Sequence, residues 1–461
     1  MFTHLRFQGF KSWQDTGPLR LAPLTGFFGV NSAGKTALLQ ALLLLKQTVE
    51  STDRTRVLHL GDERTYVDLG TFYDVIFGHE MPGRLAFDLT WTLPKPLRIP
   101  DPEGMKTLFR IETLRYTGIV HGDGEGMQVA SFAYQFQNGP DGGRRYRFGM
   151  EQEAEDQNGQ KPRYNLVAEG YEVRRTVGRP GKLPPPMKCY GFPDQVNAFY
   201  QNVGFLADLT LAFEEAMQRI YYLGPLREYP HRIYVWAGEQ PQDVGQRGEL
   251  AVHALLGAER KGIKISPGPR KRRITVTEQV ARWLRDLGLI HSFEVRPIAE
   301  NRKEYEVRVR RSARSAEVAL TDVGFGVSQI LPVLTLCYYA PEGSTLILEQ
   351  PEIHLHPSVQ AGLADVFIDA IRTRKIQIIL ESHSEHLLRR LQRRIAEEKL
   401  RPDETALYFI DTDGGKSEAQ ALEVDLFGNI HNWPANFFGD EMGDLVAMTE
   451  AAMARQVDGE A

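Results

Sequence analysis

The chain has 461 residues, of which 55 are basic and 60 acidic, so its formal net charge is −5. Hydrophobic residues make up 42% and charged residues 25%, which is the composition of a soluble globular protein and excludes a disordered or collagen-like chain. The two cysteines, Cys189 and Cys337, are too few for a disulfide framework and favour a reducing compartment.

Two further classes are disfavoured by the pattern of apolar and charged residues. The longest unbroken apolar run, Ala41 to Leu45, is far shorter than the ~20 residues that a membrane span needs. The N-terminal sequence MFTHLRFQGF lacks the apolar core of a signal peptide, so we expect a cytoplasmic protein with no membrane partner. The slightly acidic total disfavours a globally basic nucleic-acid binder but allows a local basic patch.

The first 80 residues alternate strand and helix signals. Short apolar runs predict strands at Phe2–Phe7, Leu19–Leu21 and Thr25–Phe28. The segment Thr36–Gln47 is apolar almost all round, so it is predicted to be a buried helix.

The middle of the chain has a different texture. From about Leu85 to Val177, short alternating segments are separated by Gly, Asp and Asn clusters, which predicts an antiparallel meander. Residues 179–186 (RPGKLPPP) have the composition of a stiff linker, and helical periodicity returns over Val196–Tyr222.

From Ile274 onward, helices and apolar strands alternate again, which is typical of an α/β core. Helices are predicted at Thr275–Leu287, Val359–Arg372 and Glu385–Lys399, and strands at Tyr305–Arg311, Ser344–Leu348, Ile376–Leu380 and Leu407–Ile410. We therefore predict an α/β fold in which a β-rich insertion (85–200) divides a core formed by 1–84 and 201–415, followed by a C-terminal extension (416–461).

The most specific motif is the sequence from Gly29 to Thr36, GVNSAGKT, which matches the phosphate-loop pattern GxxxxGK[ST] and lies between a predicted strand and a predicted helix. Its glycines let backbone N–H groups surround a phosphate chain, and the helix N-terminus adds a positive dipole end. Lys35 is expected to contact the β- and γ-phosphates of ATP, and the Thr36 hydroxyl to bind Mg²⁺.

Two later strands supply candidate partners for this loop. The strand Ser344–Leu348 ends in Glu349, which we expect to hold Mg²⁺, and the next core strand is followed by His383, a candidate sensor of the γ-phosphate. His354 and His356 are a weak metal signal, so no metal other than Mg²⁺ is predicted.

These elements, in this order, resemble the ABC-type ATPase heads of the SMC, RecF and OLD families, which are P-loop NTPases with a mixed sheet flanked by helices. The opening LRFQGFKSW and PLTGFFGVNSAGKT carry that resemblance, including Asn31, and imply that Lys11, Ser12, Ser32, Ala33 and Gly34 also lie at the nucleotide. The segments YLGPLREYP, ILEQPEIHLHP, ESHSEHLL and NWPANFFGD resemble a bacterial subgroup of stand-alone ATPases, often associated with phage defence, in which a short domain of unknown function follows the head.

The resemblance implies homo-oligomers in which a signature loop of one head closes the nucleotide site of another. DVGFGVSQ occupies that place, with Gly324, Gly326 and Ser328 as candidate contacts, but it departs from the usual leucine-serine-glycine-glycine-glutamine pattern. The register is therefore open, and a simple helix N-cap turn is the alternative.

A second departure concerns hydrolysis. The family places a water-activating glutamate after the metal-associated acid, whereas this chain has Gln350. A glutamine cannot accept a proton as a general base, so either Glu349 or Glu352 serves as the base or the protein is a slow, nucleotide-gated clamp. An engineered replacement of glutamate at 350 is a further possibility. We favour a slow ATPase that controls a separate effector, such as a nuclease or toxin, in antiviral defence.

Arginine clusters leave nucleic acid open as a partner. Arg270, Lys271, Arg272 and Arg273 precede a predicted helix, and Arg389 and Arg393 share a helix face at i, i+4 spacing. A third cluster, Arg308, Arg310, Arg311 and Arg314, lies on or after a predicted strand. The alternatives are solvated helix faces, a RecF- or SMC-like DNA-repair ATPase, and a nucleotide-locked scaffold that holds a toxic partner. The long β-rich insertion argues against a transporter subunit.

Overall fold

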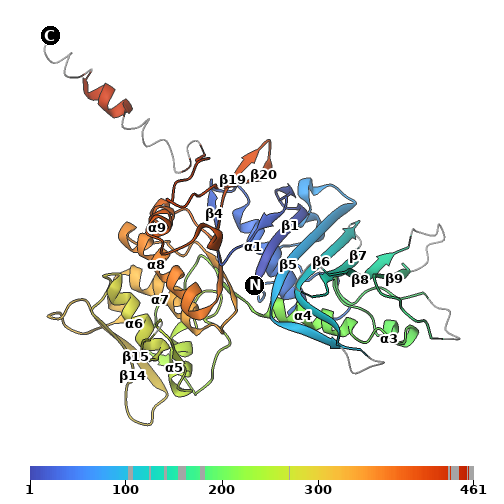
Figure 1. The fold of residues 1–461 in the computed structure, drawn as a ribbon. Helices are drawn as coiled ribbons and strands as arrows, with labels where there is room; N and C mark the ends of the chain where they lie inside the picture. The colour runs from blue at the N-terminus through green and yellow to red at the C-terminus, as the bar shows by residue number, and fades with distance from the viewer. Residues whose placement is uncertain are drawn as a thin grey trace.

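The computed structural model describes residues 1–101, 107–123, 126–139, 143–153, 162–176, 182–268, 270–434, 437, 446–453 and 455. Two large sheets organise the chain. An antiparallel sheet with its helices lies on one side, and a mainly parallel sheet with several helices lies on the other (Figure 1).

The antiparallel sheet has eight strands in the order β2-β1-β5-β6-β7-β8-β9, with β3 paired to β1. Its strands are β1 (Phe2–Phe10), β2 (Trp13–Asp15), β3 (Leu19–Arg20), β5 (Gly83–Pro100), β6 (Thr107–Gly122), β7 (Met127–Gln137), β8 (Arg145–Gln152) and β9 (Tyr164–Glu169). Burial alternates along β5 and β6, as expected for a sheet with one covered face. The predicted meander is confirmed, and the pairing of β1 with β5 joins it to the N-terminal strands.

Helices cover the inner face of this sheet. They are α1 (Lys35–Glu50), α3 (Gln195–Phe199) and α4 (Leu206–Gln218). The short helix α2 (Phe72–Val75) and the 3-10 turn η1 (Phe77–His79) come just before β5 in the sequence. Aromatic side chains fill the space between: the ring of Phe213 lies 4.5 Å from that of Tyr116 and 6.0 Å from that of Trp91, centre to centre. Such contacts add to the burial that holds α4 on the sheet.

The second sheet has six strands in the order β10-β17-β18-β4-β19-β20. They are β4 (Leu24–Gly29), β10 (Ile220–Leu223), β17 (Thr345–Glu349), β18 (Gln377–Glu381), β19 (Thr405–Asp413) and β20 (Lys416–Ala421). All neighbours are parallel except β19 and β20. Every residue of β4, β17 and β18 is buried, which explains their uninterrupted apolar sequences.

Helices and small sheets surround this parallel sheet. The helices are α5 (Ala251–Arg260), α6 (Val276–Asp286), α7 (Phe325–Tyr339), α8 (Pro357–Arg374) and α9 (Glu385–Ala396), with the 3-10 turns η2 (Leu320–Asp322) and η3 (Pro402–Glu404). The small strands are β11 (Tyr234–Val235), β12 (Lys264–Ile265), β13 (Ile274–Thr275), β14 (Ser292–Pro297), β15 (Glu304–Arg310) and β16 (Val318–Ala319).

The predicted α/β fold with its flanked mixed sheet is confirmed, but one element was predicted wrongly. The helical segment predicted over Val196–Tyr222 extends too far toward the C-terminus. Its last residues belong to strand β10 (Ile220–Leu223), which pairs in parallel with β17. Pairing with a buried neighbour outweighs the local helical pattern. Residues 179–181 of the expected linker, and 435–436 and 438–440 of the NWPANFFGD motif, lie outside the described residues. Within the described residues, no helix combines the length and apolarity needed to cross a membrane.

Candidate functional site

The phosphate-loop motif forms a tight turn between β4 and α1. Gly29, Ser32 and Gly34 have φ values of 133°, 61° and 93°, and a Cβ on Gly29 would lie 2.0 Å from the Ile410 carbonyl oxygen. The buried Lys35 donates hydrogen bonds to the carbonyl oxygens of Gly29 (3.1 Å) and of Val30 (2.6 Å). The ammonium is thereby held inside the loop, at the N-terminal end of α1, where anions are favoured.

The other predicted loop residues line the same turn with different exposure. Asn31 and Ser32 are exposed, whereas Ala33 is buried. Asn31 and Ser32 therefore lie on the solvent side of the turn, where a ligand can reach them.

Lys11 and Ser12 lie beside this loop, at the turn between β1 and β2. Trp13 Nε1 donates to the Gly34 carbonyl oxygen at 2.9 Å, and Ser12 Oγ lies 2.6 Å from Ser417 Oγ of β20. Lys11 Nζ donates to Gln40 Oε1 of α1 at 2.5 Å. Burial lowers the pKa of Lys11, and the nearby Glu349 opposes that shift. The turn therefore supports α1 and adds a cation near the strand ends.

Carboxylates end two neighbouring strands next to the loop. Glu349 of β17 and Glu381 of β18 are register partners, and Glu381 is itself paired with Phe27 of β4. The Thr36 hydroxyl donates to Glu381 Oε2 at 2.8 Å, while Tyr222 Oη donates to Glu349 Oε1 at 3.1 Å. Glu381 opens the ESHSEHLL motif, but only His383 of that motif was predicted as a site residue.

Burial controls the charge of these groups. It raises the pKa of Glu349 to about 7, and the neighbouring charge of Glu381 adds to the rise. Burial likewise raises the pKa of Glu381, against the hydrogen bond from Thr36 and the charge of Lys35. Side chains that supply hard oxygen atoms, two carboxylates and a hydroxyl, thus meet beside a phosphate loop, and this donor set fits Mg²⁺.

The residues after β17 connect the two strand ends. Gln350 has a φ of 43° and donates its backbone N–H to the Glu381 carbonyl oxygen at 2.9 Å. Glu352 Oε1 accepts the backbone N–H of His383 at 2.7 Å. Burial raises the pKa of Glu352, and burial together with the charge of Lys35 lowers that of His383. All three predicted residues therefore lie around one position at the carboxyl edge of the sheet.

Arg227 is a second residue beside the strand ends that the sequence motifs do not predict. The residue is 8% exposed, and its Nη2 lies 3.4 Å from the carbonyl oxygen of Glu349 at the end of β17. Among the described residues, its Nε and Nη1 atoms have no hydrogen-bond partner. Burial lowers its pKa to about 10, while Tyr222, Glu349 and Glu352 act in the opposite direction. The segment YLGPLREYP was noted for its resemblance, yet no local signal marks this arginine as buried.

The expected signature loop lies at the start of α7. Gly324 is exposed and precedes the helix as its N-cap, Gly326 lies in the first turn, and Ser328 is buried. Arg232 pairs with the adjacent Asp322, with Nη2 2.7 Å from Oδ1. The contact with a second head stays a prediction.

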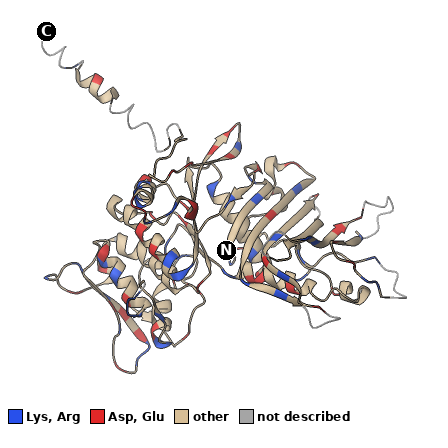
Figure 2. Cartoon of the chain, viewed as in Figure 1, with Lys and Arg blue, Asp and Glu red and all other residues tan. Residues whose placement is uncertain are grey.

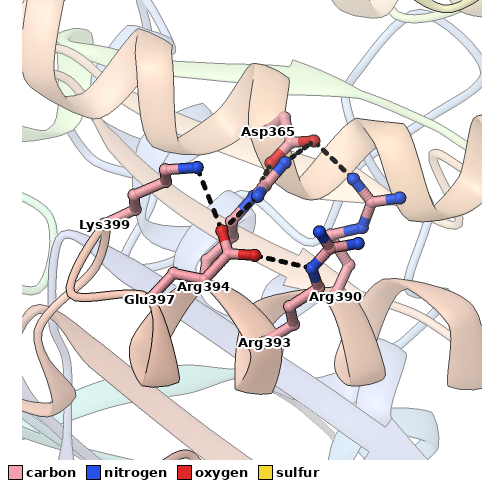
Figure 3. Close-up of polar contacts among 6 residues, drawn as sticks. All are labelled: Asp365, Arg390, Arg393, Arg394, Glu397 and Lys399. Carbon is pink, nitrogen blue, oxygen red and sulfur yellow. Dashed lines mark hydrogen bonds and ion pairs between the residues drawn. The ribbon is translucent and has the colours of Figure 1, made fainter.

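The arginines of α9 are engaged by acids. Figure 3 shows Asp365 of α8 between Arg390 and Arg394, and Glu397 facing Arg393, Arg394 and Lys399. Arg389 pairs with Glu385 and stacks over the ring of Trp433. Acid partners thus neutralise the expected stripe of Arg389 and Arg393, which weakens it as a phosphate-binding surface.

The basic segment 270–273 differs from α9. Its four residues are exposed and lie in the connection between β12 and β13. Within the part of the chain that the structure describes, none of them has an ion pair shorter than 4.0 Å. Elsewhere, acidic and basic residues are interspersed along the ribbon (Figure 2).

Two family profiles match the chain. Residues 297–389 match the AAA_21 family, described as "AAA domain, putative AbiEii toxin, Type IV TA system". Residues 400–448 match DUF3696, a "Protein of unknown function". The first match contains β17, β18 and His383, and the second contains β19 and β20. The chain is therefore similar to AAA-type ATPases over the strands that carry the carboxylates, in agreement with a P-loop ATPase. No curated protein matches the sequence.

Several solved structures of SMC heads are also similar. An SMC head bound to the C-terminal winged-helix domain of ScpA gives a TM-score of 0.45 at 10% identity, covering 92% of this chain and 98% of that one. The SMC head domain from Thermotoga maritima gives 0.37 at 12%, covering 92% and 99%. A Pyrococcus furiosus Smc head with an extended coiled coil, bound to the C-terminal domain of ScpA, gives 0.43 at 9%, covering 92% and 96%.

Proposed function

We propose that this chain is an ATP- and Mg²⁺-binding ATPase that hydrolyses ATP slowly. The observation that carries the proposal is the meeting of the phosphate loop with the strand-end carboxylates, above all the hydrogen bond from Thr36 to Glu381 beside Glu349. Asn31 to Thr36, with Lys11 and Ser12 alongside, would hold the nucleotide. Thr36 and Glu349 would hold Mg²⁺, which, when bound, neutralises charge on the phosphates.

The residues around the γ-phosphate position have separable roles. His383, kept neutral by burial and by Lys35, would donate a hydrogen bond to the terminal phosphate. Gln350 can orient water but cannot accept its proton, so the base would be Glu352 or Glu349. Because Glu352 already accepts the His383 N–H, it would couple water activation to the sensor. Slow turnover follows from this indirect arrangement.

The biological setting is part of the same proposal. The matched description names a toxin of a type IV toxin–antitoxin system, and the sequence resembles stand-alone defence ATPases. We therefore infer that ATP state controls a separate effector protein, such as a nuclease, in bacterial antiviral defence. The chain would act in the cytoplasm as a homo-oligomer, with Gly324, Gly326 and Ser328 closing the nucleotide site of the facing head. A nucleotide-locked scaffold is the limiting case without turnover.

One observation favours a second candidate, a DNA-binding ATPase of repair or recombination. The basic segment 270–273 is exposed and, within the described residues, lacks ion pairs, so its charge is available to a phosphate backbone. The ion-paired α9 arginines do not add to this argument.

Nucleotide binding and phosphate release test the main proposal. The wild-type protein should bind a fluorescent ATP analogue with Mg²⁺ and release phosphate at well below one per second. Lys35→Ala should lose binding, because the loop then lacks its phosphate-facing cation. Gln350→Glu should raise turnover by about tenfold or more if a general base is what the site lacks. Fast turnover in the wild type would refute slow hydrolysis, and an absence of nucleotide binding would refute the whole proposal.

A further inference from the structure

Glu381 is a buried acid whose carboxylate lies beside the phosphate loop. It is 3% exposed, ends β18 and accepts the hydroxyl hydrogen of Thr36, the residue proposed to bind Mg²⁺. Gln350, which stands where the family has an acid, donates its backbone N–H to the carbonyl of the same residue. The site therefore contains two strand-end acids, but the second one comes from β18 and not from position 350.

The two acids lie side by side on neighbouring strands, and each accepts a hydrogen bond from a hydroxyl group. Glu349 and Glu381 are register partners on neighbouring parallel strands, so their side chains leave the sheet on the same face at a strand separation of about 4.8 Å. Glu349 is 6% exposed. Among the described residues, neither carboxylate has an ion pair within 4.0 Å. Two buried like charges at this separation repel each other strongly.

We propose that Glu381 is a third protein group of the metal site, beside Thr36 and Glu349, and that this acid pair makes nucleotide binding strictly dependent on a divalent cation. This inference rests on the proposed function. A divalent cation takes oxygen ligands from carboxylates, hydroxyls and phosphates, so it relieves the repulsion between the acids and links them to the phosphate chain. Without the cation, the same two acids face a polyanionic nucleotide and oppose its binding.

A purely structural role for Glu381 makes a different prediction. If it only anchors the Thr36 hydroxyl, an amide oxygen at the same place serves equally well. Glu381→Gln keeps that acceptor and removes the charge, so the variant separates anchoring from metal binding. Glu385→Gln is the matched control, because Glu385 lies four residues further on, in the first turn of α9, and pairs with Arg389 at the surface.

The test uses the full chain and two readouts that do not depend on turnover. Mn²⁺ binding is followed by electron paramagnetic resonance with saturating ADP, and binding of a fluorescent ADP analogue is measured in EDTA. Glu381→Gln should weaken Mn²⁺ binding about 10- to 100-fold. At a pH well above neutral, where the wild type has lost the proton held by the acid pair, the same variant should bind the metal-free nucleotide several-fold more tightly than the wild type, because one repelling charge is gone. Glu385→Gln should match the wild type in both.

The outcomes distinguish a failure of the role of Glu381 in the metal site from a failure of the proposed ATPase function. If the wild type binds nucleotide with Mn²⁺ but Glu381→Gln changes neither affinity by more than twofold, this inference is overturned and the ATPase proposal stands. If the wild type binds no nucleotide with the metal, both are overturned. Should Glu381→Gln fail to fold, Glu381→Asp decides. A carboxylate withdrawn by one methylene should weaken Mn²⁺ binding and leave metal-free nucleotide binding weak, and an unchanged Mn²⁺ affinity contradicts the inference.

Discussion

At the scale of single residues, the fold raises the pKa of the Glu349 carboxyl group toward neutral pH. Burial raises its pKa to about 7, and the charge of Glu381 adds to the effect. The hydrogen bond from Tyr222 and the charges of Arg227 and Lys11 act in the opposite direction. Before nucleotide and metal bind, the site therefore holds a proton near neutral pH, and binding of a cation should release it.

This proton predicts an unusual dependence of stability on pH. The ordinary pKa of the carboxyl is 4.5, so between pH 4.5 and about 7 the folded protein binds a proton that the unfolded chain has lost. The free energy of unfolding then falls as the pH rises through that window, by roughly 3 kcal/mol at most. Glu349→Gln should remove this loss, as measured by urea unfolding of the metal-free protein at pH 5 and pH 8.

Comparison with the wild type isolates the contribution of Glu349. His383 has a lowered pKa, so it makes stability rise with pH up to its ordinary value of 6.5, and it is present in both proteins. The surface control Glu385→Gln should keep the slope of the wild type. An equal decline in Glu349→Gln and in the wild type would show that another group binds the proton.

At the scale of elements, the phosphate loop is held by a turn and a strand distant from it in sequence. The β1–β2 turn supplies Ser12 and Trp13, and β20, in the segment that matches DUF3696, supplies Ser417. A Cβ added to Gly34 would lie 2.3 Å from Ser417 Oγ and 2.5 Å from Ser12 Oγ. The C-terminal segment therefore forms part of the support of the loop.

Gly34→Ala tests this support. The residue has a φ of 93°, where a side chain is strained, and it has no room for a methyl group. We expect a loss of roughly 1–3 kcal/mol in the free energy of unfolding, measured with urea, together with loss of ATP binding. Gly17→Ala is the matched control: its φ is 63°, but a Cβ there meets nothing within 4 Å. If both variants lose the same stability, backbone strain alone accounts for the cost.

The same elements show what the sequence could predict. Strands β4, β17 and β18 are buried on both faces, so their apolar runs identify them without tertiary information. Strand β10 was predicted as helix, because its pairing with β17 joins residues more than 120 positions apart. Pairing between distant segments leaves no periodic trace in either of them.

The site was predictable to the extent that its residues belong to contiguous motifs. Lys35, Thr36, Glu349 and His383 follow from strand-loop patterns, and the structure brings them together. Glu381 was not predicted as a site residue, because its place beside Glu349 depends on the pairing of β18 with β17. Arg227 was not predicted either, because its contact with Glu349 joins residues that are far apart in the sequence. The i, i+4 spacing of Arg389 and Arg393 correctly predicts a shared face, and the same spacing places Glu385 and Glu397 beside them as partners. The sequence does not show that Asp365 of α8 pairs with the neighbouring arginines of α9.

At the scale of the whole molecule, the net charge of −5 means that any contact with nucleic acid must be made by a local cluster of basic residues. The α9 arginines are paired with Asp365, Glu385 and Glu397. The basic segment 270–273 is exposed and, in the described residues, without ion pairs. If a polyanion binds, we expect these four residues to contribute to the release of counterions, while the net negative charge of the chain limits non-specific binding.

The salt dependence of binding tests this assignment. Fluorescence anisotropy with a labelled 20-nucleotide strand and with a duplex, between 50 and 200 mM salt, gives the slope of log K against log salt. Replacing Arg270, Lys271, Arg272 and Arg273 with serine should reduce that slope by about 3, because each phosphate contact contributes roughly 0.7–0.9. Arg389→Gln/Arg393→Gln should leave it unchanged, since the acid partners already neutralise those charges. A slope that changes only in the α9 variant would assign the contact to α9 in place of 270–273, and an absence of binding in the wild type would leave protein as the partner class.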